Sequence, residues 1–302
     1  MSRAARFHQY GPPEVLSWDE VDLPEPGPGQ VRVRVRVAGV QPFDIKLRRG
    51  DLAAQRPVRF PAQVGNEYAG TVDAWGPGVS GPPIGQEVAG SVNGTGCAEY
   101  VLAPVEDVVP KPAGLDLVTA GALVAAAQTA SGALGILGVG PGDTLLAHAA
   151  AGSVGTVAVQ LAREIGATVI GTASDANHDY LRTLGAIAVR YGEGLVDRVR
   201  KVAPQGVSVV LDAIGGEALA ASAQLVADPS RIGTIADPAG AARYGARLAF
   251  APRSPARLAE VLALAEAGKL VMPVETFPGE QIAAAHRRTE GGHVRGKVVV
   301  LI

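Results

Sequence analysis

The stretch TLLAHAAAGSVG, residues 144–155, joins a short apolar run to a loop of small residues and the start of a helical pattern. Thr144–Ala147 is predicted to be a buried strand, and Ser153–Ile165 carries apolar residues at helical spacing. Between them, the spacing Ala150-x-Gly152-x-x-Gly155 matches the phosphate-binding fingerprint of dinucleotide-binding folds, with alanine at its first position. This context favours a phosphate loop, and the alternative is a helix start of small residues that binds nothing.

The same alternation of strands and helices continues along the middle of the chain. Further strands are predicted at 167–171, 187–189, 207–211, 231–235 and 247–251, and helices at 179–184, 195–202 and 217–226. Six strands separated by helices predict a parallel, doubly wound sheet. After Pro252 the pattern predicts helices at 255–267 and 279–289 and a final strand at 297–302.

The first 110 residues are predicted to be β-rich. Valines at 31, 33, 35 and 37 alternate with arginines at 32, 34 and 36, which is the period of a strand with one buried face. Clusters of proline and glycine before and after this strand predict tight turns. Short strands between such turns indicate a compact β-barrel or sandwich-like domain.

Two glycine-rich stretches are interpreted as structural. The run GVGPGD at 138–143 precedes a strand, so it cannot place a phosphate on a following helix and is predicted to be a turn. The uncharged stretch from Leu117 to Gly140 is interrupted by glycines and rich in alanine, which favours two buried helix segments over a membrane span.

Composition excludes several classes of protein. Of 302 residues, 47% are apolar, so the chain is expected to fold. Its 27 basic residues are outnumbered by 29 acidic ones, so no excess of positive charge is expected to bind nucleic acid. The single cysteine, Cys97, excludes intramolecular disulfides and cysteine-rich zinc sites and is interpreted as a buried or partly buried structural thiol. No apolar segment of signal-peptide length begins the sequence, so a cytoplasmic protein is expected.

The second strand of the α/β region bears on the choice of cofactor. Enzymes that use NAD often place a carboxylate at the end of this strand, where it binds the ribose 2′-hydroxyl. Here Gly171 and Thr172 stand at the tip and Asp175 lies beyond it. Hydrogen-bond donors for a 2′-phosphate are expected from Ser174, Asn177 and His178, although His178 is equally compatible with a surface helix position. The sequence therefore favours NADPH over NADH.

A catalytic metal is not expected. The segment Gly65-Asn66-Glu67 has asparagine where a zinc alcohol dehydrogenase would have histidine, and Val40–Asp44 contains no cysteine. The five histidines do not cluster at ligand spacing.

Taken together, these motifs resemble the medium-chain dehydrogenase/reductase superfamily, in its zinc-free quinone oxidoreductase branch, which is similar to zeta-crystallin. The matching segments are RFHQYG at 6–11 with PEVL at 13–16, AGVQPFD at 38–44, GNEYAG at 65–70, GCAEYV at 96–101, the loop 150–155, LGA at 184–186 and GHVRGKVV at 292–299. The resemblance implies a GroES-like catalytic domain from residues 1–112 and 252–302, with a Rossmann dinucleotide-binding domain of six strands inserted at 113–251. Such reductases form dimers by extending the parallel sheet, so a homodimer through the strand 247–251 is expected.

The resemblance also implies residue roles. Thr129 would bind the nicotinamide carboxamide, the loop would bind the pyrophosphate, Tyr191 would contact the adenosine side, and Lys297 would lie near the cofactor phosphates. The family's Asn-Pro is Gln41-Pro42 here, and its second loop glycine is Ser153. The expected cofactor-binding residues are Gln41, Thr129, Ala150, Gly152, Ser153, Val154, Gly155, Ser174, Asn177, His178, Tyr191, Ile214, Ile235 and Lys297.

The function expected from the resemblance is NADPH-dependent reduction of small-molecule quinones or α,β-unsaturated carbonyls without zinc. Alternatives are a pathway-specific enoyl or carbonyl reductase and a non-catalytic NADPH-binding protein, since a fold does not determine function. No residue stands out as a general acid. The candidate catalytic residues in the matched segments are Gln41, Asp44, Lys46 and Tyr68, and water is the alternative proton source.

Overall fold

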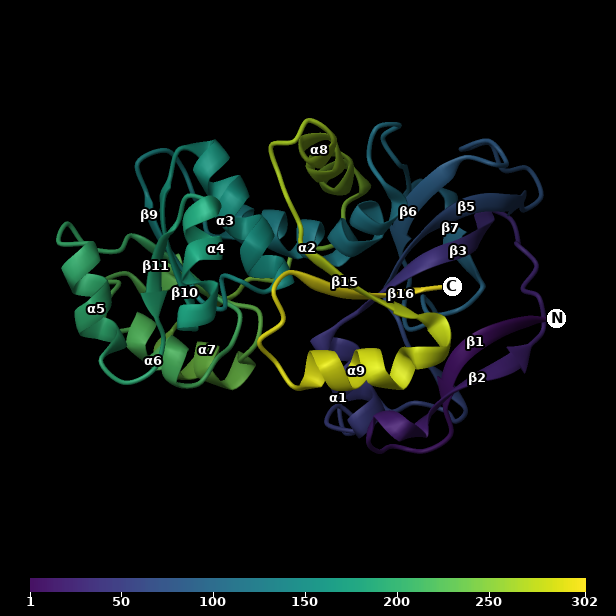
Figure 1. Ribbon diagram of the computed structural model, residues 1–302, viewed down its shortest axis with the longest axis horizontal. Helices are drawn as coiled ribbons and strands as arrows, with labels where there is room; N and C mark the ends of the chain where they lie inside the picture. The colour runs from purple at the N-terminus through teal and green to yellow at the C-terminus, as the bar shows by residue number, and fades with distance from the viewer. The chain divides into compact units, whose positions relative to one another are not determined.

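The structure is a computed structural model that describes every residue from Met1 to Ile302. The chain divides into two compact units. Unit 1 consists of Met1–Ala125, Ser254–Ala267 and Met272–Ile302, and unit 2 consists of Ala126–Arg253 and Gly268–Val271. Both ends of the chain therefore belong to unit 1, while the α/β middle forms unit 2 (Figure 1).

Unit 1 is built mainly from antiparallel strands. Its larger sheet has the order β15-β16-β3-β5-β6-β8, with β7 also paired to β3, and its smaller sheet has the order β2-β1-β4. The strands are β1 (Ser2–Phe7), β2 (Leu16–Val21), β3 (Gln30–Val40), β4 (Ala62–Gln63), β5 (Glu67–Trp75), β6 (Glu87–Ser91), β7 (Tyr100–Pro104), β8 (Val108–Pro110), β15 (Val274–Pro278) and β16 (Lys297–Leu301). The helices are α1 (Pro42–Arg49), α8 (Pro255–Glu266) and α9 (Ile282–Glu290). The predicted β-rich start is confirmed.

Strand β3 is central to unit 1, because it pairs with β5, β7 and β16. Its four valines at 31–37 are buried and Arg34 and Arg36 are exposed, as the alternation predicted. Arg32 is largely covered, since its guanidinium donates to the Asp73 carboxylate at 2.6 Å. Strand β16 runs antiparallel to the end of β3, which joins the last residues of the chain to its first forty.

Unit 2 contains the predicted six-stranded, all-parallel sheet, with the order β11-β10-β9-β12-β13-β14. The strands are β9 (Thr144–Ala147), β10 (Thr168–Ala173), β11 (Ile187–Arg190), β12 (Val209–Asp212), β13 (Ile232–Thr234) and β14 (Arg247–Leu248). The helices that pack against them are α3 (Ser153–Ile165), α4 (His178–Thr183), α5 (Leu195–Val202), α6 (Glu217–Ser222) and α7 (Pro238–Tyr244) (Figure 1). The order reverses between β9 and β12, which is where such sheets bind ligands beyond their carboxyl ends.

The uncharged stretch near residue 120 forms one helix, α2 (Leu117–Ile136), so the expectation of two helix segments was wrong. The helix is rich in alanine, the residue with the highest helix propensity. The single glycines at 121, 132 and 135 therefore do not end it. It is the one helix long and apolar enough to cross a bilayer, and 67% of its most apolar window is buried by protein. That burial fits a core helix.

Several shorter elements differ from the sequence prediction. Helices α1 and α7 and strand β15 were not predicted, although both helices begin with proline after a polar residue, which is a helix-start signal. In α7 the Asp237 carboxylate caps the helix by accepting the N–H of Gly240 at 2.8 Å. Helix α6 ends at Ser222 instead of Val226, and the edge strand β14 has two residues instead of five.

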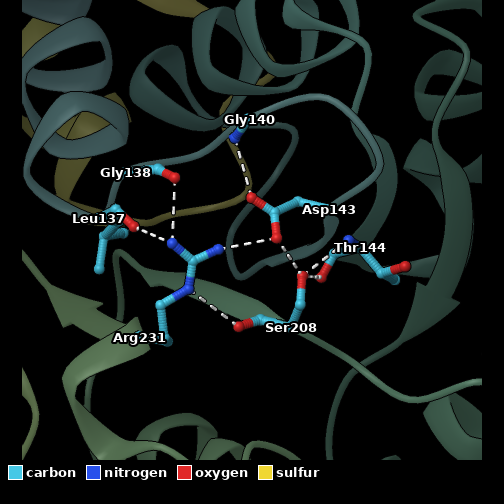
Figure 2. Close-up of polar contacts among 7 residues, drawn as sticks. All are labelled: Leu137, Gly138, Gly140, Asp143, Thr144, Ser208 and Arg231. Atoms are coloured by element: carbon cyan, nitrogen blue, oxygen red, sulfur yellow. Dashed lines mark hydrogen bonds and ion pairs between the residues drawn. The ribbon is translucent and has the colours of Figure 1, made fainter.

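A polar network stabilises the amino-terminal edge of the parallel sheet (Figure 2). The Asp143 carboxylate accepts hydrogen bonds from Arg231 Nη2 at 2.7 Å, Ser208 Oγ at 2.7 Å and Gly140 N at 2.8 Å. Arg231 also donates to the carbonyls of Leu137 and Gly138. The run 138–143 is therefore the turn that its position before β9 predicted, at the edge opposite to the fingerprint loop.

We expect Asp143→Asn to lower the free energy of unfolding by about 2 kcal/mol, because an amide cannot accept from all three donors. Burial acts to raise the pKa of Asp143, but the hydrogen bonds from Ser208, Gly140 and Arg231 outweigh it and lower that pKa. The stabilisation is therefore complete above the ordinary aspartate pKa of 3.8 and is lost as the pH falls through the lower folded-state pKa. Urea denaturation at pH 7 and at pH 3 measures both effects.

The control is Glu164→Gln, which removes an ion pair with Lys269 in which both side chains are more than half exposed. Its expected effect is below about 0.5 kcal/mol. Equal effects of the two substitutions would contradict the assignment of Asp143.

Candidate cofactor-binding site

The fingerprint loop lies at the carboxyl end of β9, between that strand and α3. The loop is held to the neighbouring strand, since Ala150 N donates to the carbonyl of Thr172 at 3.0 Å. It then closes on itself, with Gly152 N donating to the carbonyl of Ala149 at 3.0 Å. Ala149 has a positive φ of 52°, a conformation that non-glycine residues adopt rarely and that is often found at functional sites.

The two glycines of the loop meet different surroundings. A Cβ on Gly152 would approach only the Ala149 carbonyl oxygen, at 3.4 Å, so the space beside Gly152 is open. A Cβ on Gly155 would lie 2.4 Å from that oxygen and 2.5 Å from Ala150 Cα, so Gly155 is needed for close packing. No side chain caps α3 at Gly152, which leaves the first N–H groups of the helix free to bind an anion. The loop therefore fits a pyrophosphate.

His148 directly follows β9 and precedes the loop, and sequence analysis did not identify it as part of the site. Ser222 Oγ donates to the Ala218 carbonyl at 2.8 Å, so it accepts from His148 Nε2 at 2.9 Å. His148 Nδ1 then accepts from Thr172 Oγ1, at 3.1 Å. Burial lowers the pKa of His148 to about 4, so the ring is neutral at pH 7. The two hydrogen bonds of the ring hold His148 beside the start of the loop.

A pocket of about 400 Å³ lies where β10 and β11 end. Its lining residues are Ser174, Asp175, Arg190, Tyr191, Gly192, Glu193 and Arg198. Ser174 and Tyr191 were predicted cofactor contacts, whereas the two arginines were missed. Of the other predicted contacts in this region, Asn177 is buried and His178 has Nε2 3.8 Å from Asp175 Oδ1, and neither lines the pocket.

The charges of this pocket correct one step of the sequence argument. Asp175 lies beyond the strand tip as predicted, but its carboxylate still lines the pocket. It is paired with Arg190, whose Nη1 lies 3.1 Å from Asp175 Oδ2. Arg198 is held by the chain itself, because its Nε and Nη2 donate to the carbonyls of residues 190–192. The pocket thus contains two cations. Arg198 is held in place by backbone carbonyls, and Arg190 is paired with Asp175.

The loops after β12 and β13 complete the same edge of unit 2. The buried Asp212 carboxylate accepts from Ile214 N at 3.1 Å and from Thr234 Oγ1 at 2.6 Å. This network places Ile214, which is exposed, and Ile235, which is half-buried, beyond the ends of their strands. Thr129 is half-buried in α2.

In unit 1 the structure brings three of the predicted residues into one buried cluster, which also contains Glu67. The Asp44 carboxylate accepts from Gln41 N at 2.9 Å, Asn66 Nδ2 at 2.7 Å and Gly65 N at 3.2 Å. Burial raises the pKa of Asp44 to about 6, although the N–H donors and Lys297 oppose that rise. The Glu67 carboxylate accepts from Gln41 Nε2 and pairs with the buried ammonium of Lys297.

One of the candidate catalytic residues is not placed to act as an acid. Tyr68 is fully buried, its hydroxyl has no hydrogen-bond partner, and burial raises its pKa, so it is a core residue. Lys46 is exposed on α1. Cys97 is buried, as predicted, and burial raises the pKa of its thiol. No group of three or more His, Cys, Asp or Glu side chains lies at metal-binding distance.

Comparison with known proteins gives the family of this fold and site. Residues 27–113 match the alcohol dehydrogenase GroES-like domain, and residues 184–300 match the zinc-binding dehydrogenase family. A 2-haloacrylate reductase from Burkholderia sp is 33% identical over 100% of this chain and 99% of its own length. The chain belongs to the medium-chain dehydrogenase/reductase family. Members of this family bind a nicotinamide cofactor, NAD or NADP, and the chain is an oxidoreductase.

Two further comparisons place the chain among its relatives. The structure of the quinone oxidoreductase from Coxiella burnetii superposes with a TM-score of 0.89 at 30% identity, covering 100% of this chain and 99% of that one. The spectinabilin polyketide synthase protein NorB of Streptomyces orinoci is 36% identical over 87% of this chain, but the chain spans only 13% of NorB.

We expect Gly152→Val to weaken binding of the cofactor at least about tenfold, on the order of 1.4 kcal/mol, with little change in Tm. Gly152 has an extended backbone, with φ −74° and ψ 174°, so valine fits the fold but fills the space for the pyrophosphate. The control is Gly155→Ala, whose Cβ would collide with the backbone and should lower Tm. Isothermal titration with NADPH and thermal melts measure both, and unchanged affinity in a folded Gly152→Val protein would contradict the phosphate-loop assignment.

Proposed function

We propose that this chain is an NADPH-dependent reductase of small-molecule quinones or α,β-unsaturated carbonyls. The observation that carries the proposal is the open, uncapped start of α3 after a loop with space beside Gly152, which suits a dinucleotide pyrophosphate. When bound, NADPH supplies the hydride, and the protein supplies orientation. Thr129 is proposed to bind the nicotinamide carboxamide, and Gln41 is proposed to contact the substrate or a cofactor ribose.

The preference for NADPH is supported by the pocket at the ends of β10 and β11. Arg190, Arg198 and the Ser174 hydroxyl provide donors for a 2′-phosphate. The negative charge of Asp175 opposes this preference, because it repels a phosphate. The ion pair between Asp175 and Arg190 offsets that repulsion. Both side chains of that pair are about two thirds exposed, so Arg190 exchanges Asp175 for a phosphate at little cost.

The proton that completes the reduction is proposed to come from water. Tyr68 is enclosed in the core, and the Asp44 carboxylate is already surrounded by three N–H donors. We also propose that the reaction proceeds without zinc, because Gln41 and Asn66 offer amides where soft or imidazole ligands would be needed.

A second candidate function is a pathway-specific enoyl or carbonyl reductase, which the similarity to a 2-haloacrylate reductase and to part of NorB favours. Non-catalytic binding of NADPH is the remaining alternative. For either enzyme we propose a cytoplasmic homodimer in which two copies of β14 pair, since Leu248 and Phe250 are 48% and 57% exposed at this sheet edge.

Turnover on a panel of substrates tests the function directly. The panel contains quinones, enones and unsaturated acids or thioesters, with oxidation of NADPH followed by its absorbance. We expect oxidation with several quinones or enones and slower oxidation of NADH. Turnover of one unsaturated acyl substrate alone would favour the pathway-specific enzyme, and tight binding of NADPH without any turnover would contradict both enzymes.

We expect Arg190→Gln to weaken binding of NADPH about tenfold or more, while the Kd for NADH changes by less than about twofold, because only NADPH carries the phosphate. Arg182→Gln is the matched control, since Arg182 is an exposed arginine on α4 that pairs with Asp179 outside the pocket. Fluorescence titration with both cofactors measures the effect. An equal loss of affinity for both cofactors would contradict a role in binding the 2′-phosphate.

A further inference from the structure

Three hydrogen-bond donors from distant parts of unit 1 converge on one buried carboxylate, that of Glu67. Glu67 is the first residue of β5 and has no exposed surface. Its Oε1 accepts from Gln41 Nε2 at 3.0 Å and pairs with the Lys297 ammonium, and its Oε2 accepts from the backbone N–H of Ala125 at 2.7 Å. The carboxylate thus links the end of β3, the start of β16 and helix α2.

Only a carboxylate satisfies this set of partners. Gln41 presents an amide nitrogen, Lys297 an ammonium and Ala125 a peptide N–H, and all three are donors. A glutamine at position 67 would have to turn its own NH₂ group toward at least one of them. The negative charge also determines which end of the Gln41 amide faces Glu67, because an amide oxygen would be repelled.

The contact with Ala125 lies inside a helix. Ala125 is the ninth residue of α2, where a peptide N–H ordinarily donates to the carbonyl four residues earlier. A carboxylate at 2.7 Å from this nitrogen anchors the helix directly to β5. Ala125 is also the last residue of the first segment of unit 1, and α2 continues from it to Gln128 and Thr129.

The backbone around Glu67 leaves room for this arrangement. A Cβ on Gly39, in β3, would lie 2.1 Å from Glu67 Oε1. The Glu67 carboxylate therefore fills the space that any side chain at position 39 would need. Lys297 is 3% exposed and would be an unpaired buried charge without Glu67. The site is therefore fixed from several sides.

We propose that Glu67 is a positioning residue for hydride transfer, which holds the Gln41 amide and helix α2 in one arrangement, with Lys297 as its counter-charge. This inference rests on the proposed reductase function, in which Gln41 contacts the substrate or a cofactor ribose and Thr129 binds the nicotinamide carboxamide. Glu67 does not line the pocket at the ends of β10 and β11, and its partners Gln41, Lys297 and Ala125 all belong to unit 1. Its substitution is therefore expected to leave binding of the adenosine half unchanged.

The test compares Glu67→Gln with the parent protein in three measurements. We expect kcat for the best panel substrate to fall at least tenfold, and the deuterium isotope effect with NADPH labelled at the transferred hydrogen to increase. The Kd for adenosine 2′,5′-bisphosphate, a probe of the adenosine half alone, should stay within twofold. Unchanged kcat and isotope effect in a folded variant would overturn the proposal.

A second variant separates positioning from charge balance. Glu67→Gln with Lys297→Met removes both buried charges, so its Tm should recover towards that of the parent, and it serves where the single variant does not fold. We expect its kcat to stay below that of Lys297→Met alone, because the anchors of Ala125 and Gln41 are lost only when Glu67 is replaced. Recovery of kcat together with Tm would mean that Glu67 only neutralises Lys297, and would overturn the proposal.

Asp143→Asn serves as the matched structural control. It also removes a carboxylate that accepts three hydrogen bonds, but at the amino-terminal edge of the sheet in unit 2. We expect a lower Tm with unchanged kcat and isotope effect at temperatures below the melt. A parent protein that binds the bisphosphate and NADPH but turns over no substrate would refute the reductase function, separately from the role of Glu67.

Discussion

The pairing of β16 with β3 is the contact on which unit 1 depends. Residues 298–301 pair with residues 40–37, so the last strand of the chain lies beside its central one. Strand β5 pairs with the other edge of β3, which places Lys297, Gln41 and Glu67 at neighbouring strand ends. A shift of one residue in this register would turn alternate side chains to the opposite face, and the ammonium of Lys297 would leave the carboxylate. The buried cluster is therefore a consequence of strand register.

In unit 2 the two edges of the parallel sheet differ in how their polar groups are used. At the amino-terminal edge Arg231, Asp143 and Ser208 satisfy one another and the surrounding carbonyls (Figure 2). At the carboxyl edge the first N–H groups of α3 have no side-chain cap, and Arg190 is held only by an exposed ion pair. Free N–H groups at a helix start and an arginine held by an exposed ion pair are groups that an anionic ligand can bind.

Much of the fold was predictable because it depends on local patterns. The valine alternation of β3 and the strand-loop-helix at 144–165 each fall within one stretch of sequence. The single helix α2 was misread because glycine costs a helix only about 1 kcal/mol, which packing offsets. Arg198 was missed because its place in the pocket depends on how α5 packs after β11, and Glu67 because its partners lie 26, 58 and 230 residues away along the chain.

The buried cluster of unit 1 combines two carboxylates with one ammonium and several hydrogen-bond donors. Asp44 and Glu67 bring two carboxylates into a site from which water is excluded, and Lys297 brings one ammonium. The amides of Gln41 and Asn66 and the backbone N–H groups supply the remaining stabilisation as donors. A divalent cation in this place would have to compete with Lys297 for Glu67 and would find donors where it needs lone pairs. The same donors that suit a carboxylate therefore make the cluster a poor metal site, which supports a reaction that relies on the cofactor alone.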